Sequence, residues 1–254
     1  MTVVDEFEFS LDNVIEDDLA SELPEMILFY STFGSGKTWL AASASEVEGL
    51  YPVLIIDTEG STVGTINGFD KTRIDVVRPD KKYPGKEWVA TKKILNDLLN
   101  KSHKYKTVVI DTADEVFEWA KQHGHKADDG YAQWTYVHEE FTAPKTGLFS
   151  RLKKAGFLVI LNVHEKKENA GDDLPPSSDF QWQGQGKAQL GKYPDMVGYL
   201  TRDTSSSGVS TTTLHTAPTK RAKAKNRFGL PAKIVDPTMQ GIYDIITKNN
   251  KENK

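Results

Sequence analysis

Cysteine is absent from the 254-residue chain, and so is any long apolar run. The first absence excludes disulfides and thiolate metal sites, and the six histidines are scattered apart from His123 and His125, a pair expected on an exposed helix end. The second absence excludes a span long enough to cross a bilayer. Residues 1–9 also lack the basic-then-apolar order of a secretory signal. We therefore expect no membrane association and a cytoplasmic protein.

A strong positive charge is also missing, since the formal net charge is −4. This argues against a uniformly basic nucleic-acid surface, so any DNA contact must be local. Acidic residues gather in residues 1–25, which we interpret as an N-terminal arm. The remaining length suits one large domain, for which we expect a core over residues 26–235 and a short helix with a polar tail over residues 236–254.

The most informative segment that is present runs from Met26 to Trp39. An apolar strand, Met26–Tyr30, leads into a glycine-containing turn, and Gly36-Lys37-Thr38 then opens a helix. Amides at a helix N-terminus can hold phosphate oxygens, lysine adds a mobile charge, and the threonine hydroxyl can ligate Mg²⁺. We expect the nucleotide to contact this whole turn, which comprises Thr32, Phe33, Gly34, Ser35, Gly36, Lys37, Thr38 and Trp39.

The motif departs from Gly-x-x-x-x-Gly-Lys-Ser/Thr at its first position, where Ser31 stands. An incidental Gly-Ser-Gly-Lys-Thr turn is the alternative. The phosphate loop is favoured because a strand precedes the turn and a helical pattern follows it, which is the context that such a motif requires.

Apolar runs of the kind buried in a parallel sheet recur along the chain. They alternate with helical patterns, which predicts an α/β fold with a mainly parallel sheet flanked by helices. Near the C-terminus the pattern changes to three short strands, over 196–202, 208–216 and 219–225, which predicts an antiparallel edge. Residues 165–193 read as one long flexible loop.

In such a sheet the carboxyl ends of the strands share one edge, where ligands bind. Val108–Asp111 has the form of an apolar strand ending in a Mg²⁺-holding aspartate, so Thr38 and Asp111 are the predicted metal ligands. Thr112 follows instead of glutamate, so another carboxylate must serve as the base. Glu59 is the first choice, because Asp57-Thr-Glu59 ends the preceding strand. Its alternative is a solvated loop residue, with Asp114 or Glu115 as the fallback base.

His164 ends a further core strand before the long loop, where it could sense the γ-phosphate or be a half-buried hydrogen-bonding histidine. The loop contains Phe180–Lys187, whose aromatics could stack on bases, or the loop could be a plain insertion. The basic run Lys220–Gly229 could reach phosphates of DNA or of a neighbour's nucleotide. As an alternative, it is a solvated edge strand whose lysines discourage aggregation.

The order of these motifs resembles the RecA-like P-loop ATPases, over about residues 26–235, and in particular small phage proteins of single-strand annealing and recombination. Lys225-Asn-Arg-Phe-Gly229 also resembles a motif of the bacterial RadA proteins. The resemblance implies that Glu59 is the catalytic glutamate, that His164 is the polar sensor, and that Lys225 and Arg227 reach a neighbour's γ-phosphate. With Lys37, these residues form the predicted catalytic set.

The sequence thus predicts a Mg²⁺-dependent ATPase that acts in phage DNA recombination, annealing or replication, within the host cytoplasm if a phage encodes it. The resemblance further implies a homo-oligomer with shared active sites, binding to single-stranded DNA and contacts with recombination or replication proteins. A second hypothesis is a non-hydrolysing nucleotide switch that loads another protein, with the acidic arm as its docking segment. A small-molecule kinase is disfavoured, because no lid segment with clustered arginines is evident.

Overall fold

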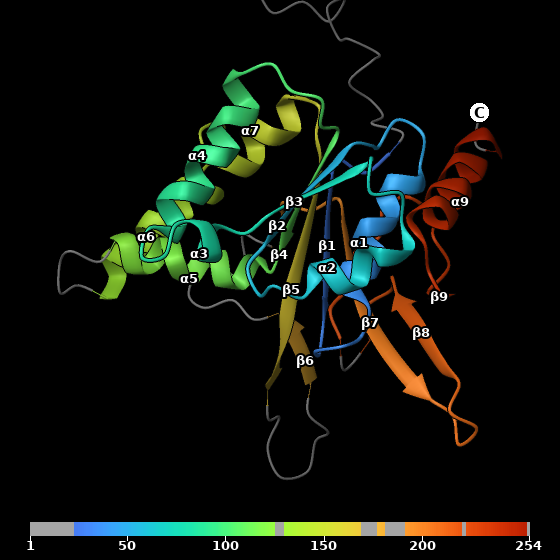
Figure 1. Ribbon diagram of the computed structural model, residues 1–254. Helices are drawn as coiled ribbons and strands as arrows, with labels where there is room; N and C mark the ends of the chain where they lie inside the picture. Colours follow the sequence, from blue (N-terminus) through green and yellow to red (C-terminus); the bar gives the residue numbers. More distant parts are fainter. Residues whose placement is uncertain (1–22, 125–129, 169–176, 181–190, 220–221, 253–254) are drawn as a thin grey trace, which may run out of the picture.

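The computed structural model describes residues 23–124, 130–168, 177–180, 191–219 and 222–252 (Figure 1). Most of the acidic arm and most of Phe180–Lys187 lie outside these residues. The strands are β1 (Met26–Ser31), β2 (Val53–Asp57), β3 (Ile74–Val77), β4 (Thr107–Asp111), β5 (Leu158–Glu168), β6 (Ser177–Phe180), β7 (Met196–Thr204), β8 (Ser210–His215) and β9 (Lys233–Val235).

Helices connect the strands and cover the sheet. They are α1 (Lys37–Ala42), α2 (Thr62–Thr65), α3 (Pro79–Lys82), α4 (Glu87–Asn100), α5 (Ala113–Gly124), α6 (Gly130–Phe141), α7 (Leu148–Lys154) and α9 (Met239–Glu252), with short 3₁₀ turns η3 (Ser43–Glu46) and η4 (Ile66–Gly68). No helix in the described part of the chain is both long and apolar enough to cross a bilayer.

The described strands form a sheet in the order β3-β2-β4-β5-β1-β7-β8-β9. Pairing is parallel from β3 to β7, whereas β8 runs antiparallel to both β7 and β9. This arrangement confirms the predicted α/β fold, a mainly parallel sheet flanked by helices with an antiparallel C-terminal edge. The phosphate-loop strand β1 is separated from the Asp111 strand β4 by β5, so the end of β5 lies between the two motifs.

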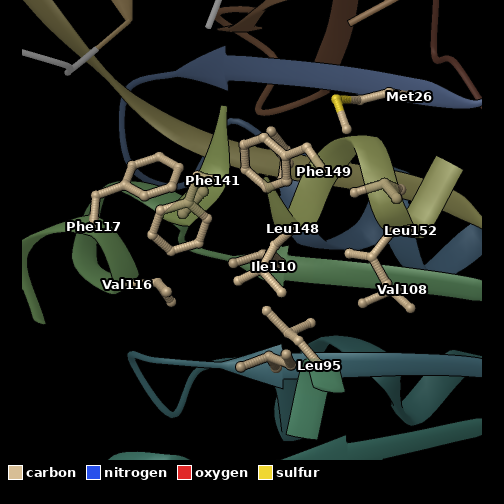
Figure 2. Close-up of a cluster of buried hydrophobic side chains, with 14 of the residues drawn as sticks. Met26, Leu95, Val108, Ile110, Val116, Phe117, Phe141, Leu148, Phe149 and Leu152 are labelled. Atoms are coloured by element: carbon tan, nitrogen blue, oxygen red, sulfur yellow. The ribbon is translucent and has the colours of Figure 1, made fainter. Parts of the chain in front are cut away.

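Side chains alternate between the two faces of the sheet, and those on each face pack into a separate hydrophobic core. On β1, Met26, Leu28 and Tyr30 enter one core, whereas Ile27 and Phe29 enter the other. The first core is closed by α4, α5, α6 and α7, and Phe117, Phe141 and Phe149 from three of these helices pack edge to face or tilted at its centre (Figure 2). The second core lies under α1 and α9. Because both faces are covered, β1, β2 and β4 are buried throughout.

The C-terminal edge differs from the expectation in its third strand. Residues 219–225 were expected to form it, but the described residues of this segment form no strand and only isolated bridges, one of which joins Lys225 to Val197 of β7. The strand that pairs with β8 is instead β9. The prediction failed because Ala-Pro turns and alternation identify strand-like segments but do not say which of them reaches the sheet.

Two segments are more ordered than the sequence predicted. β5 continues past His164 to Glu168 and pairs antiparallel with β6, so part of the expected loop over 165–193 is a hairpin. At the C-terminus, where a short helix followed by a polar tail was expected, α9 continues to Glu252. Met239, Ile242, Tyr243 and Ile246 anchor that helix on the second core, and its polar last turns extend from this anchored part.

Candidate nucleotide site

The loop between β1 and α1 has the backbone shape of an anion cradle. Gly34 and Gly36 both adopt left-handed conformations, with φ of 71° and 97°, and α1 begins at Lys37. Within the described part of the chain, the backbone N–H groups of residues 34–38 make no hydrogen bond. Peptide N–H groups left unpaired at a helix N-terminus fit a phosphate chain.

Lys37 is folded back into this loop. Its side chain is only 7% exposed, and Nζ donates to the carbonyl oxygens of Ser31 (3.3 Å) and Thr32 (3.1 Å) and to Ser31 Oγ (3.1 Å). Burial lowers the pKa of the ammonium, although the carboxylates of Asp111, Asp114 and Glu59 oppose that shift. Serine at the first motif position therefore supplies a hydroxyl that glycine would not, and this hydroxyl helps to hold Lys37.

Thr38 and Asp111 lie together although their strands are not neighbours. The Thr38 hydroxyl donates to Asp111 Oδ2 across 2.6 Å. Burial raises the pKa of Asp111, against the opposing hydrogen bond from Thr38. A hydroxyl beside a carboxylate is an oxygen-only donor pair of the kind that Mg²⁺ accepts, with phosphates and waters completing its shell. The described residues contain no group of three or more acidic or histidine side chains that could hold a metal ion. A Mg²⁺ ion at Thr38 and Asp111 would therefore need ligands from phosphate or water.

Glu59 stands on the loop after β2, and the backbone of that loop is fixed by Asp57. The buried Asp57 carboxylate accepts hydrogen bonds from the N–H groups of Glu59 (3.1 Å), Gly60 (2.7 Å) and Thr62 (3.4 Å). Asp57 is therefore a cap for this loop. Glu59 itself is not simply solvated, because its carboxylate turns toward β5.

A chain of three side chains crosses the cleft from α5 to this loop. His164 Nδ1 lies 2.8 Å from Asp114 Oδ2, and His164 Nε2 lies 3.3 Å from Glu59 Oε1. The backbone N–H of His164 also donates to Asp114 Oδ1 at 3.1 Å. Both oxygens of Asp114 are thus engaged by His164, which disfavours Asp114 as the fallback base. Glu115 is exposed and does not line the cleft.

The pKa shifts in this chain have opposing causes. Burial alone would lower the pKa of His164, but the hydrogen bond that His164 donates to Asp114 and the charges of Asp114 and Glu59 raise it overall, against the opposing charge of Lys37. Burial raises the pKa of Glu59, and the charge of His164 partly offsets that rise. An imidazolium between two carboxylates fits both directions. Phe33 covers the histidine ring, with ring centroids 4.3 Å apart, although Phe33 is itself 78% exposed.

These groups line one cleft of about 580 Å³. Its floor is the phosphate loop from Phe33 to Thr38. Trp39 and Leu40 lie beyond it, and Glu59, Asp111 and His164 form one end. The other side is contributed by the C-terminal edge of the sheet, through Arg202, Ser210, Thr212, Asp236 and Pro237. Thr32 does not line the cleft, but its hydroxyl bonds to Ser35 Oγ (2.9 Å) within the loop.

Lys225 and Arg227 lie outside this cleft. Lys225 bridges Val197, five residues before Arg202 on β7, and this places it roughly 16 Å from the cleft along the strand. Its Nζ donates to the carbonyl oxygens of Lys192 (2.8 Å) and Pro194 (2.6 Å), and burial followed by the charge of Arg227 lowers its pKa. Arg227 is exposed.

Two residues at the site were not predicted from the sequence. Arg202 lines the cleft from β7, with Nη1 3.4 Å from the Gly34 carbonyl. Asn162 is fully buried in β5 beside Asp111, and its amide opposes the rise in the pKa of that carboxyl that burial causes. A signal existed for Asn162, the one polar residue inside the apolar run Phe157–Val163. For Arg202 the sequence offered only its place near the end of a predicted strand.

The solved structures similar to this fold include a RadB recombinase, at 13% identity over 83% of this chain and 85% of that one, with a TM-score of 0.48. They also include the flagellar accessory protein FlaH from Methanocaldococcus jannaschii, at 10% identity over 83% and 84% of the two chains, with a TM-score of 0.46. No curated protein matches the sequence significantly. Residues 23–228, which contain the phosphate loop, Glu59, Asp111 and His164, match the AAA domain family AAA_24. The chain therefore belongs to this family of AAA-domain proteins.

Proposed function

We propose that the protein is a Mg²⁺-dependent ATPase whose hydrolytic base is Glu59. The observation that carries this proposal is the convergence, in one cleft, of a phosphate cradle, an oxygen donor pair and a carboxylate. These are the residues from Gly34 to Lys37, the pair Thr38 and Asp111, and Glu59. Phosphoryl transfer needs positioning and charge stabilisation more than covalent chemistry, so these groups are sufficient for it.

Each group has one role in this proposal. The N–H groups of the loop and the Lys37 ammonium bind the β- and γ-phosphates, so Lys37 exchanges its contacts with Ser31 and Thr32 for phosphate oxygens. Thr38 and Asp111 hold Mg²⁺, which offsets charge that develops on the phosphoryl oxygens. The Glu59 carboxylate orients the attacking water and accepts its proton. His164 Nε2 lies beside the Glu59 carboxylate. When that carboxylate turns to the water, His164 loses this contact and is free to contact the γ-phosphate, and this is its role as the sensor.

The sequence resemblance supports a cellular role for this chemistry in phage DNA recombination, annealing or replication. It also supports a homo-oligomer in which Lys225 and Arg227 of one chain approach the γ-phosphate of the next, and binding to single-stranded DNA. The position of Arg227, exposed and outside its own chain's cleft, is compatible with action on a neighbour.

Steady-state turnover of ATP by the purified chain tests the hydrolase against the non-hydrolysing switch. We expect Mg²⁺-dependent release of phosphate that EDTA abolishes and that single-stranded DNA stimulates. A Lys37→Ala chain, purified in the same way, controls for contaminating ATPases. Tight ATP binding without phosphate release, both with and without DNA, would favour the switch.

A further inference from the structure

Arg78, the residue that follows β3, packs directly against the loop that carries Glu59. β2 and β3 are parallel neighbours with Ile56 and Val77 in register, so the chain leaves both strands side by side. A Cβ atom built on Gly60 would lie 2.4 Å from Arg78 Nη1 and 2.5 Å from its Cζ. Gly60 also has a φ of +76°. Glycine is thus required there both for the turn and for the approach of the guanidinium.

The Arg78 guanidinium is held by an ion pair with a residue two positions further along the chain. Arg78 Nη2 pairs with Asp80 Oδ2 at 2.7 Å, and Asp80 lies in the first turn of α3. Arg78 Nε is buried and makes no hydrogen bond within the described residues, so the pair with Asp80 is the contact that sets the head group. The hydrogen bond and the charge of Asp80 raise the pKa of Arg78, and the charge of the Asp57 carboxylate adds to that rise.

Two contacts therefore restrain the backbone of the Glu59 loop. At the end of β2, the Asp57 carboxylate accepts hydrogen bonds from the N–H groups of Glu59, Gly60 and Thr62. At the end of β3, the guanidinium of Arg78 packs against the backbone of Gly60. With the backbone of the loop held in this way, only the side-chain torsions of Glu59 remain to place its carboxylate.

We propose that Arg78 is a positioning residue that sets the reach of Glu59 toward the attacking water. The inference rests on the function proposed above, because it assigns a task to Arg78 only if Glu59 is the base. Arg78 does not line the cleft, and within the described residues no hydrogen bond or ion pair joins it to the phosphate loop, so we expect nucleotide binding to survive its loss. A displacement of about 1 Å at a reacting group can slow a reaction roughly 100-fold.

The first test is Arg78→Ala in steady-state ATP turnover. We expect kcat to fall roughly 10- to 100-fold with KM for ATP within about twofold. Arg73→Ala is the matched control, because Arg73 also pairs with an aspartate, Asp70, and has a similarly exposed side chain (39% against 31%) but does not contact the Glu59 loop. Guanidinium ions added to the Arg78→Ala protein should restore part of kcat by occupying the vacated space.

A double-mutant cycle separates positioning from a general structural role. In a Glu59→Gln background the base is already gone, so Arg78→Ala should lower the residual rate no further. A structural role would lower the residual rate and the ATP affinity again.

Gly60→Ala provides an independent approach to the same contact. The new methyl group displaces the guanidinium, and we expect a loss of kcat of the same order as in Arg78→Ala. Gly85→Ala is its matched control, since Gly85 has nearly the same φ (+77°) but nothing within 4 Å of a built Cβ. Equal effects of the two glycine substitutions would show that backbone strain alone acts, and would overturn the proposal.

The two proposals fail in different ways. If Glu59→Gln turns over ATP as the unchanged protein does, Glu59 is not the base and the role of Arg78 falls with it. If Glu59→Gln is inactive but Arg78→Ala keeps full kcat, only the role of Arg78 is overturned.

Discussion

The phosphate-loop edge of the sheet and the Lys225–Arg227 segment were predicted as two halves of one site, and the fold treats them differently. At the edge, side chains from four separate segments are joined by direct hydrogen bonds, as between Thr38 and Asp111 or between His164 and Asp114. Lys225 instead bonds to nearby backbone carbonyls, and Arg227 is exposed. One half is built within a chain, whereas the other half becomes part of a site only if the proposed oligomer brings a second chain to it.

This difference explains what could be predicted from the sequence. Carboxyl ends of parallel strands must share an edge, so Ser31, Asp57, Asp111 and His164 were foreseeable neighbours once their strands were identified. No comparable rule places a loop residue such as Lys225. The same limit applied to residues 219–225, whose composition resembles a strand although β9 occupies the sheet edge.

Details of the site were less predictable because they depend on side-chain geometry. From the sequence, Asp114 was expected only as a fallback base, whereas both of its carboxylate oxygens bond to His164. Asn162 and Arg202 reach the site from segments that the sequence identified only as strands. Arg78 contacts Gly60 because β2 and β3 are adjacent, and this adjacency becomes visible only in the sheet order.

The largest expected effect is the loss of ATP turnover when Arg227 is replaced. Arg227→Ala should lower ATP turnover about 10³-fold in the assembled protein, as loss of a cation that stabilises the transition state does elsewhere, with little change in ATP affinity. Mixing Arg227→Ala with Lys37→Ala chains should restore part of the activity, because one interface then combines an intact loop with an intact Arg227. Each variant alone, at the same total concentration, is the control. If the mixtures stay inactive while subunits exchange, the two regions do not share a site.

A smaller effect is expected on ATP affinity, where the two lysines should differ. Lys37→Ala removes a buried ammonium from the phosphate cradle and should weaken ATP binding roughly 10- to 100-fold, as expected for hydrogen bonds to charged groups. Lys225→Ala should leave the affinity unchanged in the isolated chain, since Lys225 lies outside the cleft. Titration with a fluorescent ATP analogue measures both. Equal losses of ATP affinity in the two variants would show that Lys225, like Lys37, contacts the nucleotide bound to its own chain.

The smallest effect is a shift in the pH profile. The base must be unprotonated, and burial raises the pKa of Glu59 above its usual value of 4.5, so kcat should fall as the pH decreases through that raised pKa. The charge of His164 opposes the rise. His164→Gln removes that charge and should move the acid limb to higher pH. An acid limb that stays in place, or moves to lower pH, would show that His164 does not act on Glu59.

The central claim is that Glu59 in the nucleotide cleft is the hydrolytic base. It is tested most directly by measuring ATP affinity and single-turnover ATP cleavage on the same Glu59→Gln protein, with Glu115→Gln as the exposed-carboxylate control. We expect ATP to bind nearly as tightly as to the unchanged protein, while cleavage slows by about 10²- to 10⁴-fold and Glu115→Gln cleaves normally. Unchanged cleavage by Glu59→Gln would contradict the claim.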